Sequence, residues 1–165
     1  MEHPKSKGER TTLAVMIALR EEGYAISIPF GENTRYDLLI DDGNTIGRVQ
    51  CKTGRLRAGA VLFNVCSCYG HHSNPAQVRR DYHGEVDYFA VFCKETDGVY
   101  LVPIHQISTR VLGTLRVAPP RNNQMKHVRL AADFQIGCLA IGRAPGRRRD
   151  EPAGRPGVPA SSPAG

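Results

Sequence analysis

The sequence lacks any long hydrophobic run and any sign of an export signal. No apolar stretch approaches the roughly 20 residues that a membrane-crossing helix needs, and residues 1–10 are polar and charged, without the apolar segment of a secretory signal. Four of the five cysteines lie in apolar, strand-like surroundings: Cys51, Cys66, Cys93 and Cys138. That setting is typical of reduced, buried thiols and not of a disulfide framework. These absences predict a cytoplasmic protein with no membrane partner.

The formal net charge of the chain is +6. A basic balance favours a polyanionic partner, because lysine and arginine neutralise phosphate and release its counterions. About half of this excess lies after residue 141, where five arginines face only Asp150 and Glu151. The charge therefore permits nucleic-acid binding without demonstrating it.

The composition changes sharply near the C-terminus. Residues 142–165 are rich in Gly, Pro, Ala and Arg and hold almost no large apolar side chain, so they cannot bury enough surface to offset the entropy of ordering. We expect residues 1–141 to form one domain and residues 142–165 to be a disordered tail. The arginines at 147–149 either add a nonspecific contact with phosphate or are simply solvated.

The remaining chain alternates between helical and strand-like patterns. Residues 11–22 predict an amphipathic helix that ends at Gly23, with Leu13, Met16, Ile17 and, more weakly, Ala14 and Ala18 on its apolar face. Strands are predicted over residues 24–28, 36–40, 45–52, 60–65, 86–94, 99–102 and 115–117, and helices over 104–112 and after Pro75; residues 131–136 fit either state. This order predicts an α/β fold, a mixed β-sheet flanked by helices.

The segment Asp41-Asp42-Gly43-Asn44 predicts a tight hairpin turn. If Asp42 and Gly43 form a two-residue turn, Asp37 pairs with Arg48 and lies diagonally across from Gln50, with Lys52 next on the same face. The opposite face of the hairpin is apolar. On the face that carries Asp37, the polar side chains gather at the end of the hairpin that is far from the turn.

Two interpretations of this polar face compete. In the first, Asp37 forms cross-strand ion pairs with Arg48 or Lys52 at an exposed sheet edge. In the second, oxygen atoms of Asp37 and Gln50 hold Mg²⁺, and Lys52 lies beside the water that attacks a phosphodiester.

A family resemblance favours the second interpretation. The stretches 35–39 (RYDLL) and 48–54 (RVQCKTG) resemble the active-site hairpin of PD-(D/E)XK nucleases, and in particular their group I intron homing endonuclease-like branch, which has glutamine at the second acidic position. The similarity extends to the segments KGE at 7–9, GY at 23–24, PFG at 29–31, YHGEVDYFAVF at 82–92, YLVP at 100–103, LR at 115–116 and PRNNQ at 120–124. The resemblance thus implies a restriction-endonuclease-like core.

The resemblance also implies roles for individual residues. Asp37 would be the principal metal ligand, Gln50 the second ligand, Lys52 the catalytic lysine and Glu9 an auxiliary acidic group that also reaches the metal. For Glu9 a simpler interpretation is that the helix dipole favours an acidic residue in the first turn. The amide of Gln50 brings no charge, so metal affinity in the absence of DNA should be weak.

Other residues near this hairpin are candidates for DNA contact. Arg55 and Arg57 follow the predicted catalytic strand, and Arg79 and Arg80 lie in the irregular segment before Tyr82; guanidinium groups suit phosphate and guanine edges. Tyr82 either approaches the site or is a core aromatic. The run from Cys66 to His72 contains residue types that bind zinc, but its spacing fits no common zinc site.

The sequence therefore predicts an endodeoxyribonuclease that uses Mg²⁺, with Mn²⁺ able to substitute, to hydrolyse double-stranded DNA. Because a duplex needs two cuts, we expect a symmetric oligomer, and the family resemblance implies a homodimer or homotetramer. A Holliday-junction resolvase-like nuclease, a non-catalytic DNA-binding protein with the same fold and a small structural domain are the alternatives.

Overall fold

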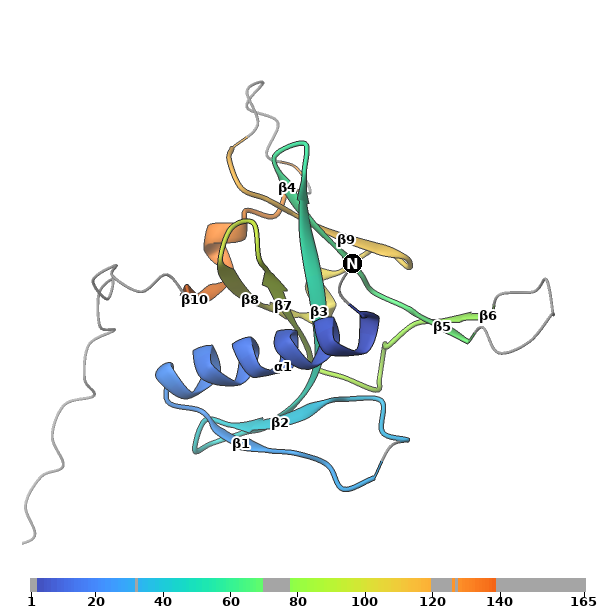
Figure 1. Cartoon of the computed structure of the whole chain (residues 1–165), viewed down its shortest axis with the longest axis vertical. Helices are drawn as coiled ribbons and strands as arrows, with labels where there is room; N and C mark the ends of the chain where they lie inside the picture. Colours follow the sequence, from blue (N-terminus) through green and yellow to red (C-terminus); the bar gives the residue numbers. More distant parts are fainter. Residues whose placement is uncertain (1–2, 32, 70–77, 120–125, 127, 139–165) are drawn as a thin grey trace, which may run out of the picture.

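The computed structural model describes residues 3–31, 33–69, 78–119, 126 and 128–138 (Figure 1). The predicted tail, residues 142–165, and the predicted helix after Pro75 lie outside these ranges. None of the helices in the described ranges is long and apolar enough to cross a membrane.

One α-helix and ten strands make up the described part of the chain. In chain order they are α1 (Pro4–Glu21), β1 (Ala25–Ser27), β2 (Leu38–Asp41), β3 (Ile46–Arg57), β4 (Ala60–Asn64), β5 (Ser67–Tyr69), β6 (Val78–Arg80), β7 (Tyr88–Cys93), β8 (Gly98–Pro103), β9 (Leu112–Arg116) and β10 (Gln135–Cys138). Short 3₁₀ turns span Ile104–Gln106 and Ala131–Asp133.

Eight strands form one mixed sheet, as the sequence predicted. Its main order is β1-β2-β3-β7-β8-β10, and β4 and β9 extend it from the far end of the long strand β3. The β3–β7 pair is parallel and the other pairs are antiparallel. Strands β5 and β6 form a separate hairpin that projects to one side of the molecule in Figure 1. The parallel pair β3–β7 lies at the centre of the sheet and carries the candidate site.

Helix α1 crosses the sheet and covers one of its faces (Figure 1). It begins earlier than the predicted residue 11, because His3 caps its N-terminus and Pro4 fits the first helical position. Gly23, at φ +93°, follows its end as predicted. The predicted apolar face is wrong in part: Leu13 is 61% exposed and Ile17 is 50% exposed.

The helix buries instead the stripe formed by Ala14, Val15, Ala18 and Leu19. Its two alanines have small side chains, which allow the helix backbone to approach the sheet closely. This stripe packs on Leu38, Ile40, Val49, Ala90, Phe92 and Val99 of the strands. Helix α1 therefore covers the apolar face of the β2–β3 hairpin.

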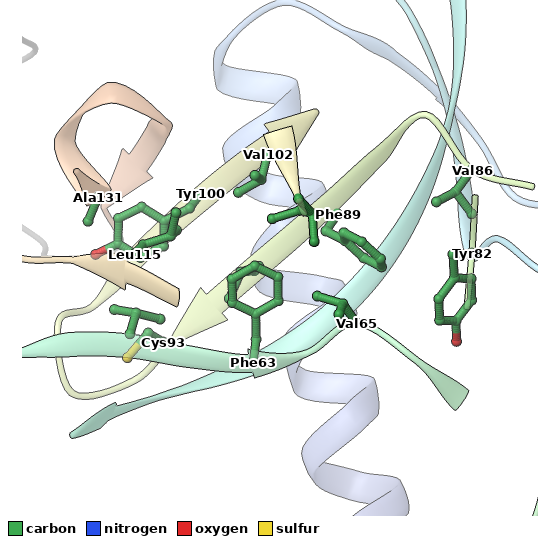
Figure 2. Close-up of a cluster of buried hydrophobic side chains, with 13 residues drawn as sticks. Phe63, Val65, Tyr82, Val86, Phe89, Cys93, Tyr100, Val102, Leu115 and Ala131 are labelled. Atoms are coloured by element: carbon green, nitrogen blue, oxygen red, sulfur yellow. The ribbon is translucent and has the colours of Figure 1, made fainter. Parts of the chain in front are cut away.

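A second apolar cluster fills the other face of the sheet (Figure 2). Phe63 and Tyr82 both contact Phe89 edge-on, with ring centroids 6.1 Å and 5.6 Å from it. Leu115 of β9 is fully buried here. The predicted helix over residues 104–112 is wrong. A 3₁₀ turn spans only Ile104–Gln106, and the chain then pairs as β9 with β4, which buries Leu115.

The register of the β2–β3 hairpin also differs from the prediction. Asp41 pairs with Ile46 and Leu39 with Arg48, so residues 42–45 form a four-residue loop instead of a two-residue turn. Asp42 closes this loop, since its Oδ1 accepts hydrogen bonds from the backbone N–H groups of Asn44 and Thr45, each at 2.8 Å. The shift of two positions keeps each side chain on its predicted face, because strand side chains alternate with period two.

Candidate active site

The side chains of Asp37 and Gln50 meet at the end of the β2–β3 hairpin that is far from the turn. The register pairs Leu38 with Val49, and Asp37 and Gln50 flank this pair. The backbone N–H of Asp37 donates to the carbonyl of Val49 at 2.9 Å, which holds Asp37 at the start of β2. Both side chains lie on the sheet face opposite α1.

The carboxylate of Asp37 is half-buried and held by two hydrogen bonds. Its Oδ2 accepts from Gln50 Nε2 at 2.6 Å and from the backbone N–H of Cys51 at 2.7 Å. Burial raises the pKa of Asp37 above its ordinary value; the Cys51 hydrogen bond, the charge of Lys52 and the Gln50 hydrogen bond oppose that rise. Burial of the charged carboxylate costs free energy, and a bound cation would offset that cost.

Lys52 lies on the same face as Gln50, two residues along β3. Its Nζ donates to the hydroxyl of Tyr82 at 3.0 Å and lies 4.4 Å from the centroid of that ring. The Arg35 guanidinium carbon is 4.1 Å from the same centroid. Tyr82 is thus a core aromatic whose hydroxyl also borders the candidate site. Both roles that the sequence left open for Tyr82 therefore apply.

A network around Arg35 joins three separate segments of the chain. Arg35 donates to Glu85 Oε2 at 2.5 Å, to Ser67 Oγ at 2.8 Å and to the carbonyl of Asp81 at 2.7 Å. Glu85 also pairs with Arg80, and its hydrogen bond with Arg35 is the main cause that lowers its pKa. This network ties the segment before Asp37 to the β5–β6 hairpin. Sequence reasoning assigned no role to Arg35 or Glu85, although both lie in segments that carry the family resemblance.

Arg48 does not pair with Asp37, contrary to the ion-pair interpretation. Its guanidinium contacts both carboxylate oxygens of Asp87 at 3.1 Å, and its backbone N–H donates to Asp87 Oδ2 at 2.7 Å. Asp87 precedes β7, so this pair joins the N-terminal ends of the parallel strands β3 and β7. Arg48 therefore has its own partner, and Asp37 is left to Gln50 and Lys52.

Glu9 is exposed and lies in the second turn of α1, because the helix begins at Pro4. The interpretation of Glu9 as a first-turn residue is therefore wrong. Across the described ranges, no group of three His, Cys, Asp or Glu side chains is placed to hold a metal. The structure thus brings Asp37, Gln50 and Lys52 together and places Glu9 on a separate element.

The four candidate DNA-contacting arginines are all exposed, but they lie in different places. Arg55 and Arg57 belong to β3 itself, not to a segment after it, and alternation directs them away from the face that carries Lys52. Arg55 borders a hollow with Lys7 and Asn64. Arg79 and Arg80 lie on β6, where Arg80 pairs with Glu85.

The donor chemistry of the site fits a hard divalent cation in part. Asp37 supplies a carboxylate, and the amide of Gln50 supplies a neutral oxygen once its orientation is reversed to direct Oε1 toward a shared ion. The pair offers one carboxylate and one amide, so the low metal affinity expected in the absence of DNA stays a prediction. Cys51 adds no reactive thiolate here, because burial raises its pKa to about 12.

Comparison with known proteins identifies the chain's relatives. Curated proteins give no significant match. A bacterial homing endonuclease, I-Ssp6803I, has a similar solved structure, with a TM-score of 0.66 over 81% of this chain and 89% of that chain at 19% sequence identity. This likeness confirms the restriction-endonuclease-like fold. A sequence profile described as PD-(D/E)XK endonuclease matches residues 2–137, a range that includes the hairpin with Asp37, Gln50 and Lys52. The chain therefore belongs to the PD-(D/E)XK endonuclease family.

Proposed function

We propose that this protein is a divalent-metal-dependent DNA endonuclease of the homing endonuclease-like type, acting on double-stranded DNA. The observation that carries the proposal is the hydrogen-bonded Asp37–Gln50 pair with the Lys52 ammonium on the same sheet face. The family match and the likeness to a homing endonuclease support it. The preferred cation is Mg²⁺, and Mn²⁺ would substitute.

In this proposal Asp37 and Gln50 hold the cation, and Glu9 on α1 is an auxiliary acidic group. A divalent cation bound there would supply activation of water and neutralisation of phosphate charge. The remaining work falls to Lys52, whose ammonium has three donors. One donor is directed to Tyr82, and the others can bind the attacking water or a phosphate oxygen.

Exposed arginines are the proposed contacts with DNA. Arg79 and Arg80 on the β5–β6 hairpin and Arg55 and Arg57 at the end of β3 are the proposed contacts. The part of each chain that the structure describes carries one such hairpin site. Two cuts in a duplex therefore need at least two copies, and we propose a homodimer or homotetramer.

Metal-dependent nicking of supercoiled plasmid tests the proposal. The wild-type protein is expected to nick with Mg²⁺ or Mn²⁺ and not with a chelator, whereas Asp37→Asn, which keeps the hydrogen bonds but removes the charge, should be inactive. Salt-sensitive DNA binding without nicking would instead show a non-catalytic DNA-binding protein. Cleavage unchanged by Lys52→Ala would reject the assignment of the site.

A further inference from the structure

Tyr82 has an unusual double environment within the core. The residue is 5% exposed and belongs to the apolar cluster on the sheet face opposite α1. Figure 2 shows it at the edge of that cluster, with its hydroxyl directed away from the other labelled side chains. That hydroxyl accepts the hydrogen bond from Lys52 Nζ at 3.0 Å. The ring therefore belongs to the core, and the oxygen belongs to the candidate site.

The position of the hydroxyl is fixed by contacts with the ring. Phe89 meets the ring at an interplanar angle of 90°. The guanidinium of Arg35 lies over the ring, and Glu85, Ser67 and the carbonyl of Asp81 hold that guanidinium in turn. The hydroxyl thus has a fixed place, which a flexible surface side chain could not offer.

Lys52 needs such an anchor, because a lysine side chain has four rotatable bonds and loses considerable entropy when it is held in one place. Across the described ranges, the Tyr82 hydroxyl is the one hydrogen-bond partner of Lys52 Nζ. A phenol is neutral at ordinary pH, so it orients the ammonium without neutralising its charge. A carboxylate in the same place would have cancelled the charge that the reaction uses.

We propose that Tyr82 positions the Lys52 ammonium for DNA cleavage and that its hydroxyl, not its ring, carries this role. The inference rests on the proposed nuclease function. It adds a positioning residue beyond Asp37, Gln50 and Lys52. Arg35 supports the role indirectly, since it lies over the ring of Tyr82 and links it to the segment before Asp37.

The test compares two tyrosine hydroxyls in the same apolar cluster. Tyr82→Phe removes the hydrogen bond to Lys52 Nζ and keeps the ring, together with its contact with the ammonium. Tyr100→Phe is the matched control, because Tyr100 is also buried in this cluster but its hydroxyl donates to Thr96 at 2.9 Å. For each variant, plasmid nicking gives kcat and KM, filter binding gives DNA affinity and thermal unfolding gives Tm.

We expect Tyr82→Phe to lower kcat by about tenfold, with KM and DNA affinity close to wild type, because ground-state binding does not depend on the orientation of Lys52. Tyr100→Phe should leave kcat unchanged. In a Lys52→Arg background, Tyr82→Phe should have little further effect, since two residues that act as a unit are not additive. Equal losses in both tyrosine variants, or a full additive loss in the Lys52→Arg background, would overturn the inference in favour of a purely structural role.

A second measurement does not depend on cleavage. Reductive methylation with a ¹³C label gives each lysine an NMR signal, and loss of one signal in Lys52→Arg assigns that of Lys52. Tyr82→Phe should shift the Lys52 signal, and Tyr100→Phe should not; identical Lys52 signals in wild type and Tyr82→Phe contradict the contact. If wild-type protein cuts DNA and Tyr82→Phe cuts equally well, only the inference fails, whereas a wild-type protein that never cuts rejects the proposed function itself.

Discussion

At the residue scale, the most consequential position is Gln50. Its amide nitrogen donates to Asp37 Oδ2 at 2.6 Å, so without a cation the pair is held by a neutral–anionic hydrogen bond. A carboxylate at this position would face Asp37 with like charge, which is unfavourable without a bound cation. Glutamine therefore avoids this repulsion when no cation is present, and the proposed metal site would have one charged ligand fewer.

Gln50→Glu should reverse this balance. Without metal, repulsion between the introduced carboxylate and Asp37 should lower Tm relative to wild type. The added ligand charge should lower the Mg²⁺ concentration at the midpoint of stabilisation by about tenfold. Thermal unfolding across a MgCl₂ titration measures both effects. Gln106→Glu, on an exposed 3₁₀ turn, is the control, and an equal Mg²⁺ response in the two variants would rule out a metal site at Gln50.

At the element scale, strand β3 organises the site, because it carries Gln50 and Lys52 and pairs with β2, β7 and β4. Its middle is tightly packed on both sides. A Cβ atom added at Gly54 would lie 2.8 Å from a methyl of Val61 and 2.9 Å from a methyl of Val91. The absence of a side chain at Gly54 therefore allows β3 to pack closely against Val61 of β4 and Val91 of β7.

Gly54→Ala should lower the free energy of unfolding by about 1–3 kcal/mol, through overpacking against these two methyl groups. Gly8→Ala is the matched change in α1, where an added Cβ meets no atom within 4 Å. It should raise that free energy by about 0.5–1 kcal/mol, because alanine loses less backbone entropy than glycine. Urea unfolding measures both variants, and a stable Gly54→Ala protein would contradict the packing described for β3.

The Arg48–Asp87 pair joins the ends of the parallel strands β3 and β7 and makes stability depend on pH. The hydrogen bond with Arg48 is the main cause that lowers the pKa of Asp87. A carboxyl group with a lowered folded-state pKa stabilises the fold above its unfolded-state pKa. That stabilisation is lost as the pH falls through the folded-state value.

Asp87→Asn should therefore lower the free energy of unfolding at neutral pH by about 1 kcal/mol, a modest loss because the Asp87 side chain is 41% exposed. The difference from wild type should shrink as the pH falls through the lowered pKa of Asp87. Urea unfolding over a pH series checks the sign. A difference that is constant over the series would mean that the charge of Asp87 contributes nothing.

At the scale of the whole molecule, the sheet separates the face that carries the candidate site from the face that α1 covers. The β5–β6 hairpin projects to one side of the molecule, and the Arg35–Glu85 network ties it to the segment before Asp37 (Figure 1). Arg79 is exposed on this hairpin, and in the proposed function it would contact a DNA phosphate.

Arg79→Ala should weaken DNA binding at low salt to a similar extent for all sequences. The slope of log K against log salt should become shallower by about 1, because one phosphate contact is lost. Filter binding over a salt series measures the slope. Arg20→Ala is the control, since Arg20 lies in the last turn of α1, at the other end of the molecule from β5–β6 in Figure 1. The same slope for wild type and Arg79→Ala would exclude this contact.

The sequence alone determined which side chains share the face of the candidate site. Strand alternation assigns Asp37, Gln50 and Lys52 to one face for any register that differs by an even number of residues, so the correction of two positions left the site intact. Local turn chemistry likewise predicted the helix end at Gly23 and a hairpin around Asp42 and Gly43. These features depend on neighbours in the chain, which a sequence displays directly.

Only the tertiary structure decided the partners of those side chains. Arg48 pairs with Asp87 instead of Asp37, Lys52 meets Tyr82, and α1 turns the alanine stripe and not Leu13 toward the sheet. Each outcome depends on contacts between residues far apart in the chain. Periodicity specifies the direction of a side chain, but packing across the sheet selects the atom that it meets.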